Sequence, residues 1–143
     1  MASPTARPVF VLAFEIGVAA GLRSATAPAA ILCATQSTYA RAACIAAGGE
    51  LVADKLPFVP ARSSPAALAV RLGSGGWSGR MLALARDGSA TAGIIAGIAG
   101  ALVGSYGGEA IRGRLVAAGF PDPLVAIAED AATIGIAWDA LRI

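Results

Sequence analysis

Charged and aromatic residues are scarce in this 143-residue sequence. Only 14% of the residues are charged and 6% are aromatic, whereas 57% are hydrophobic, and the mean hydropathy is +0.71. Soluble domains carry about 25% charged residues, because a small domain exposes much of its chain to water. A soluble, Ala-rich helical bundle would need a polar face that this sequence does not supply. We therefore expect a single integral membrane domain, residues 1–143, in contact with a lipid bilayer.

Histidine is absent and cysteine is rare, which removes several kinds of site. A Ser-His-Asp triad is excluded, and Cys33 and Cys44 have no CxxC spacing, so zinc is not expected. The two cysteines are interpreted as small buried hydrophobes, with a disulfide left open. The basic residues are scattered, so no nucleic-acid partner is expected. No cofactor is indicated beyond a hard cation such as Mg²⁺ or Na⁺ at an all-carboxylate site.

What the sequence does contain is alanine and glycine in long apolar stretches, which predict an all-α fold. The expected helices cover residues 8–32, 39–56, 66–85, 90–118 and 123–143. The first is interrupted at residues 21–24, where glycine and the nearby Pro28 indicate a kink or an unwound point. Ser64 is a candidate cap for the third helix, and Asp122 for the last.

Four or five of these helices are long enough for a polytopic transmembrane bundle, since about 20 residues cross the hydrocarbon core. Glycines at 73, 75 and 76 split residues 66–85 into two short pieces. That segment is a tilted span, a re-entrant hairpin or an interfacial helix, and the first two are favoured. Glu15 inside the first apolar stretch favours a retained helix over a cleaved signal peptide.

Basic residues at the helix ends give a weak orientation signal. With five spans, one side would carry Arg7, Lys55, Arg62, Arg112 and Arg114, and the other Arg41, Arg86 and Arg142. The excess on the first side favours a cytoplasmic N-terminus.

Glycine recurs along one face of the helix expected at residues 90–118. Its spacing of four and three residues makes a stripe of Gly93, Gly97, Gly100, Gly104 and Gly108. Small residues let helix backbones approach closely in lipid, where the hydrophobic effect gives no drive for association. We expect the stripe to pack against another helix, either within the chain or across a dimer.

Ionisable residues inside the expected spans are the main functional signal. Each charge at mid-membrane costs roughly 2.5–3.5 kcal/mol on insertion scales, so these groups face each other, a watery cavity or a ligand. The candidates for a binding site or pathway are Arg23, Ser24, Glu50, Asp54, Lys55, Glu129 and Asp130. Glu50 and Asp54 share a helix face, whereas the neighbours Glu129 and Asp130 diverge. The structural alternative is a set of salt bridges that holds the helices in register.

Several of these positions belong to longer motifs. The sequence has GLRS at residues 21–24, TAPA at 26–29, GELVADKLP at 49–57, then Arg62, PD at 121–122 and AED at 128–130. Together they resemble a domain-of-unknown-function family of small bacterial polytopic membrane proteins. The resemblance covers nearly the whole chain and implies a multi-pass protein of the bacterial inner (cytoplasmic) membrane. It brings no activity and no catalytic residue.

Both ends of the chain also pair an apolar helix with an acidic pair near a proline-marked break. This pattern suggests an internal repeat, as in inverted-repeat transporters.

Three functions are compatible with these features. The favoured one is a small transporter or channel for a small solute or ion, working as a homo-oligomer because one protomer has few helices to enclose a path. The second is a membrane-embedded enzyme acting on a lipid or polyprenyl phosphate, with carboxylates on Mg²⁺ and with Arg23 and Lys55 on phosphate. The third is a structural or assembly protein, in which charges and glycines only specify helix packing.

Overall fold

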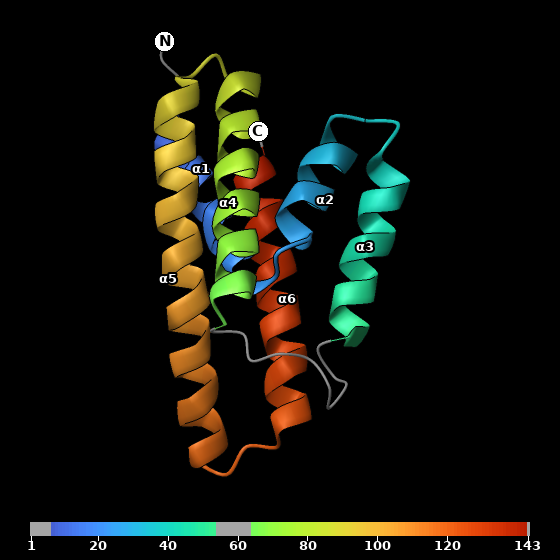
Figure 1. Ribbon diagram of the computed structural model, residues 1–143, viewed down its shortest axis with the longest axis vertical. Coiled ribbons are helices and arrows are strands. Elements are labelled where there is room, and N and C mark those ends of the chain that lie inside the picture. Colours follow the sequence, from blue (N-terminus) through green and yellow to red (C-terminus); the bar gives the residue numbers. More distant parts are fainter. Residues whose placement is uncertain (1–6, 54–63, 143) are drawn as a thin grey trace.

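Six α-helices make up the described part of the chain. The computed structural model describes residues 7–53 and 64–142 and has no strand within them. The helices are α1 Val9–Leu22, α2 Thr26–Ala34, α3 Ala40–Ala53, α4 Pro65–Ala85, α5 Ala90–Ala117 and α6 Asp122–Leu141. They pack into one bundle with α3 at its edge beside α2 (Figure 1). The all-α fold class is confirmed.

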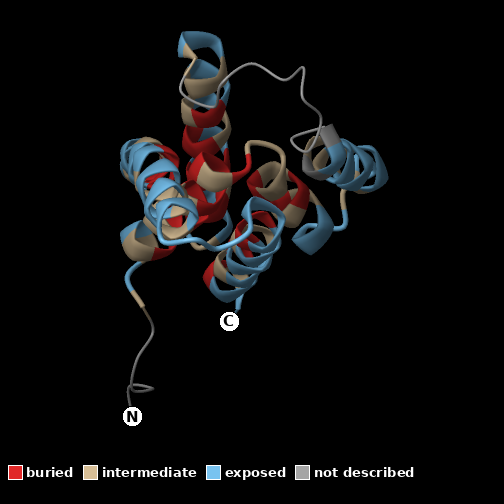
Figure 2. Cartoon of the chain, turned by 90° about the horizontal axis from the view of Figure 1, so that it is seen from below, coloured by how far each residue is buried: buried red, intermediate tan, exposed pale blue. Residues whose placement is uncertain are grey.

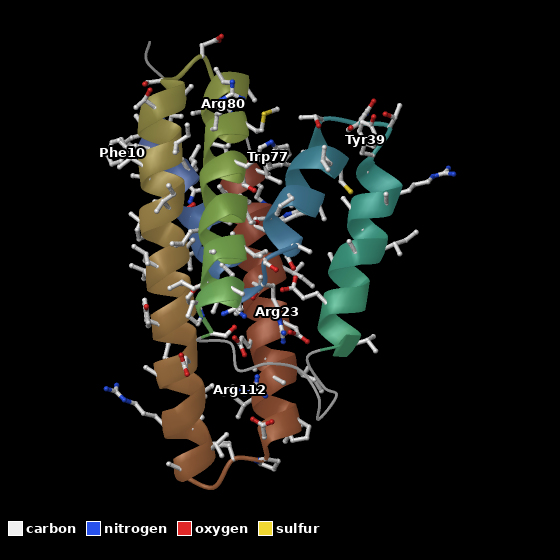
Figure 3. All side chains as sticks on the ribbon, viewed as in Figure 1. Phe10, Arg23, Tyr39, Trp77, Arg80 and Arg112 are labelled. Carbon is white, nitrogen blue, oxygen red and sulfur yellow. The ribbon has the colours of Figure 1, made fainter. Side chains whose placement is uncertain are left out.

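The interruption expected near Arg23 is present, and it reverses the chain. α1 ends at Leu22, Arg23 is extended with φ −144° and ψ 111°, and α2 begins at Thr26. In Figure 3 the chain descends from Phe10 to Arg23 and returns to the level of Phe10 at Tyr39. α1 and α2 therefore form a helical hairpin, and residues 23–25, here called the hairpin tip, lie between the two ends of the bundle. Of the two predicted forms of the interruption, a kink or an unwound point, the unwound point is confirmed, and the reversal of the chain was not predicted.

α4 is one continuous helix of 21 residues, so the prediction that its glycines split it was wrong. Its glycines instead serve packing. A Cβ added at Gly75 would lie 2.7 Å from the carbonyl oxygen of Gly97, and one at Gly79 would meet the carbonyl of Gly93. The cost of glycine in a helix, about 1 kcal/mol relative to alanine, is offset here by close contact with α5.

Of the two predicted helix caps, Ser64 is confirmed and Asp122 is not, and Ser89 is a cap that was not predicted. Ser64 caps α4, and its hydroxyl accepts from the N–H of Ala67 at 3.3 Å, with Pro65 in the first turn. Ser89 caps α5 in the same way. The prediction that Asp122 caps the last helix was wrong, because Pro121 holds that position and Asp122 is the first helical residue. The Asp122 carboxylate binds a side chain of α5 instead.

The glycine stripe of α5 packs within the chain, between α1 and α4. Gly93 and Gly97 lie against the backbone of α4, whereas Gly100 and Gly104 lie against the backbone of α1 at Phe14 and Val18. Gly108, at the end of the stripe, lies against the Leu22 side chain. These contacts bring three backbones close together, and Figure 2 shows the buried positions on the facing sides of the helices.

Apolar side chains also cover much of the outer surface. Large exposed ones occur on five of the helices and include Phe10, Ile45, Val70, Ile95 and Ile134. Among the described residues, α5 is the helix that is both long and apolar enough to cross a membrane, and α1 is apolar but has only 14 residues. α4 and α6 reach 21 and 20 residues but do not contain an apolar stretch that meets the same criterion.

Two alanine substitutions on α5 test the glycine packing. Gly97→Ala places a methyl group against the backbone of Gly75 and within 3.3 Å of the Gly79 Cα. Overpacking of this kind costs about 1–3 kcal/mol, so we expect a lower unfolding temperature in detergent by circular dichroism. Gly107→Ala is the matched control, because its added methyl meets nothing within 4 Å. An unchanged unfolding temperature for Gly97→Ala would contradict the close packing of α4 on α5.

Candidate functional site

The hairpin tip carries a buried arginine that is paired with α6. Arg23 is 1% exposed, although its long cationic side chain would normally reach water. Its Nε and Nη2 atoms donate to Oδ1 of Asp130 at 2.8 and 2.5 Å. This charge-assisted pair links the end of α1 to the middle of α6 across 107 residues of sequence.

Glu50 of α3 binds the other side of the hairpin tip. One carboxylate oxygen accepts from the N–H of Ser24 at 2.9 Å and from its hydroxyl at 2.6 Å. The second oxygen accepts from the N–H of Ala25 at 2.7 Å. The N–H groups before and at the start of a helix have no partner within the helix, and the helix dipole favours negative charge there. Glu50 therefore supplies the anion that the start of α2 requires.

Two serines bind the carbonyl groups that the break leaves open. The Ser74 hydroxyl of α4 donates to the carbonyl oxygen of Ser24. The Ser105 hydroxyl of α5 donates to the carbonyl oxygen of Gly21 at 3.2 Å. Side chains from α3, α4, α5 and α6 thus converge on one break in the backbone.

Glu129 belongs to a second polar group around Arg112, which lies below Arg23 in Figure 3. Its carboxylate lies 3.5 Å from the Arg112 guanidinium, which also binds Asp122 through two contacts of 2.8 Å. Glu129 and Asp130 point to different partners, as their adjacency in the helix predicts. Glu129 also lines a cavity of about 390 Å³ between α1, α5 and α6, beside Leu22 and Gly108.

The predicted site residues therefore separate into three sets. Arg23, Ser24, Glu50 and Asp130 meet at the hairpin tip. Glu129 lies next to that group but pairs with Arg112. Asp54 and Lys55, which the sequence also places in the site, lie outside the described residues.

Sequence reasoning missed the α4 contribution to this region. Arg71 is buried, at 6% exposure, and lies three residues before Ser74 on the same face of α4. Ser78, one turn further, is also fully buried, and its hydroxyl has no hydrogen-bond partner among the described residues. The available signal was a repeat of polar residues, at positions 71, 74 and 78, inside a glycine-rich segment.

Ion pairs near the C-terminal end of α6 change the predicted grouping of basic residues at the two ends of the bundle. Arg7 binds Glu15 at 2.9 Å and Asp139 at 2.7 Å, so Glu15 is ion-paired and not a lone carboxyl. Arg86 of the α4–α5 connection donates to the carbonyls of Leu141 and Arg142 at this same end. Grouping Arg7 with the basic residues near the end of α5 was therefore wrong.

Comparison with known proteins adds no relative, since no family model, no curated protein and no solved structure matches the sequence. Within residues 7–53 and 64–142, no group of three or more histidine, cysteine or acidic side chains is placed to hold a metal ion. The interpretation of the site therefore rests on its geometry.

Replacing Arg23 tests the pairing at the hairpin tip. Arg23→Leu leaves the Asp130 carboxylate buried without this cation, and breaking a buried pair costs about 3–5 kcal/mol. We expect a large loss of stability in chemical or thermal unfolding, and partial recovery in the double variant Arg23→Leu/Asp130→Leu. The control is Arg7→Leu, whose more exposed pairs contribute at most about 1 kcal/mol. Equal losses from Arg23→Leu and Arg7→Leu would contradict the assignment.

Proposed function

We propose that this protein is a small multi-pass membrane transporter or channel that moves a small solute or ion past the hairpin tip. The observation that carries the proposal is an unwound stretch of backbone inside the bundle, next to a buried arginine and carboxylates from α3 and α6. At membrane depth, irregular backbone is tolerated only where protein buries it or where it lines a water-filled path.

Helix lengths support several crossings of the bilayer. At 1.5 Å per residue, α4, α5 and α6 measure about 31, 42 and 30 Å, and the hydrocarbon core is about 30 Å thick. α1 measures about 21 Å and α2 about 14 Å, so their hairpin enters the bilayer and returns without crossing it. The described residues of α3 also measure about 21 Å, which is too short to cross by the same measure. We therefore infer three spans, α4 to α6, and a re-entrant hairpin whose tip lies within the membrane.

Exposed apolar surface supports both lipid contact and self-association. Soluble monomers rarely expose contiguous apolar patches of more than a few hundred Å². Here isoleucines, valines and leucines along α3, α5 and α6 face outward, at 75% exposure for Ile45 and 64% for Ile95. One protomer has too few helices to surround a wide path, so we infer a homo-oligomer in which the polar tip of each copy lines the route.

The location is inferred from the motifs at the hairpin tip. Arg23 and Ser24 of the GLRS motif lie in the tip, and Glu50, which binds Ser24, is the first of two acidic residues in the GELVADKLP motif. Because these motifs resemble the small bacterial inner-membrane family, we propose the bacterial inner membrane as its location.

The packing-only alternative also has a supporting observation. Arg23, Ser24 and Gly21 bind side chains of the same protein, which is what a purely structural role requires. The two roles differ in one respect. A structural tip tolerates Glu50→Gln whenever the fold survives, whereas a transport pathway loses activity in a folded variant.

Labelling of single cysteines tests whether α5 crosses the membrane. The arrangement puts Asp87, in the α4–α5 turn, and Phe120, in the α5–α6 connection, on opposite sides of the membrane. In a Cys33→Ser/Cys44→Ser background, a membrane-impermeant maleimide should label only one of Asp87→Cys and Phe120→Cys in sealed, oriented vesicles. Permeabilised vesicles, in which both react, are the control. Equal labelling of both positions from one side would show that α5 does not cross.

Flux through liposomes tests the assignment of Glu50. We expect wild-type protein to move protons, Na⁺ or K⁺ into vesicles that contain a pH- or cation-sensitive dye. Glu50→Gln removes the charge that binds Ser24 and Ala25, and the loss of one charged hydrogen bond, about 1.5–3 kcal/mol, predicts at least about a tenfold drop in flux.

The matched control for this experiment is Asp87→Asn, an acid-to-amide change at an exposed turn far from the hairpin tip. It should keep wild-type flux. Normal flux through folded Glu50→Gln, with all three ions tested, would favour the packing-only role.

A further inference from the structure

The chain's two cysteines face each other between α2 and α3. The Sγ atoms of Cys33 and Cys44 are 2.9 Å apart, within hydrogen-bond contact for sulfur. Cys33 is the penultimate residue of α2, and Cys44 lies in the second turn of α3. Both side chains are exposed, so their interpretation as buried hydrophobes was wrong.

We propose that Cys33 and Cys44 form a reversible disulfide that fastens α3 to α2. The oxidant is the disulfide of a thiol–disulfide oxidoreductase. One cysteine thiolate attacks that disulfide, which forms a mixed disulfide and releases one partner thiol. The second cysteine thiolate then attacks the mixed disulfide, so the Cys33–Cys44 bond forms and the partner leaves as a dithiol. Two electrons pass to the partner, and the two protons lost by the cysteines balance those gained by its thiols.

The pair is placed where such a partner can reach it. The polar connection at residues 35–38 follows Cys33 almost at once, and Cys44 lies four residues, or about 6 Å, along α3 from its start at Ala40. Trp138, an aromatic side chain typical of the membrane–water boundary, lines the same groove of about 630 Å³ as both cysteines. These neighbours place both thiols within about one helical turn of the water-exposed end of the bundle.

α3 is the helix that gains most from such a bond. No α3 residue whose burial is described is buried, and the helix packs mainly on α2 at the edge of the bundle (Figure 2). Glu50 lies six residues after Cys44, about 9 Å along the same helix. A disulfide at Cys44 therefore limits the movement of the carboxylate that binds the hairpin tip. This proposal concerns α3 and does not require that the protein transports anything.

Peptide mass spectrometry of the full-length protein tests the bond directly. Trypsin cuts after Arg23, Arg41 and Lys55, so the two cysteines fall in different peptides, residues 24–41 and 42–55. After treatment with an oxidised thiol–disulfide oxidoreductase, we expect these peptides to be joined within a monomer and to separate on reduction with dithiothreitol. Maleimide should label two cysteines before oxidation and none after it.

The single variants Cys33→Ser and Cys44→Ser are matched controls, which should keep one labelled thiol and give no joined peptide in the monomer. Retention of both labels in oxidised wild-type protein, or cross-linking only between two copies, would overturn the proposal. Hydrogen exchange at the Ser24 and Ala25 amides should be slower in the oxidised form, because Glu50 stays bound. Equal exchange in both forms would overturn the fastening of α3.

Discussion

A helix that breaks inside an apolar bundle leaves N–H and C=O groups where water does not readily reach them, and each unsatisfied group destabilises the fold. In this chain the break falls between α1 and α2. Each of the other four helices contributes one side chain to it: Glu50, Ser74, Ser105 and Asp130. Glu50, Ser74 and Ser105 bind backbone groups of the break, and Asp130 binds the Arg23 side chain, so the four helices are held around one short stretch of chain.

Glycine makes this arrangement possible. Serine has a short side chain, so its hydroxyl reaches the backbone of another helix only when the two helices are very close. Gly104 lies against the backbone at Val18, next to the point where Ser105 binds the carbonyl of Gly21. The glycine stripe and the hairpin tip are therefore linked through Ser105, which would not reach the Gly21 carbonyl across a wider spacing of α1 and α5.

Local signals in the sequence predicted local structure well. Glycine and proline marked the break near Arg23, Ser64 marked the start of α4, and the glycine period marked the face of α5 that packs. The cost of buried charge correctly singled out Arg23, Glu50 and Asp130 as residues with partners. The sequence could not predict the direction of the chain after the break, because a kink and a reversal are both compatible with the same glycine and proline residues. The continuity of α4 was missed for a related reason. Glycines destabilise an isolated helix, and the contact with α5 that offsets this cost cannot be seen in the sequence of α4 alone.

The types of side chain at the hairpin tip are informative beyond the fact that its backbone groups are hydrogen-bonded. The neutral hydroxyl groups of Ser74 and Ser105 bind the two carbonyls of the break. A serine or threonine at the N-cap position of α2, which Ala25 occupies, would likewise be a neutral cap. The chain instead brings in a carboxylate from α3, the helix with the least packing of its own. The Glu50 carboxylate can bind the N–H groups of Ser24 and Ala25 only while α3 lies beside the hairpin tip. The cap of α2 and the position of α3 therefore depend on each other, and a capping side chain within the hairpin tip itself would provide no such coupling.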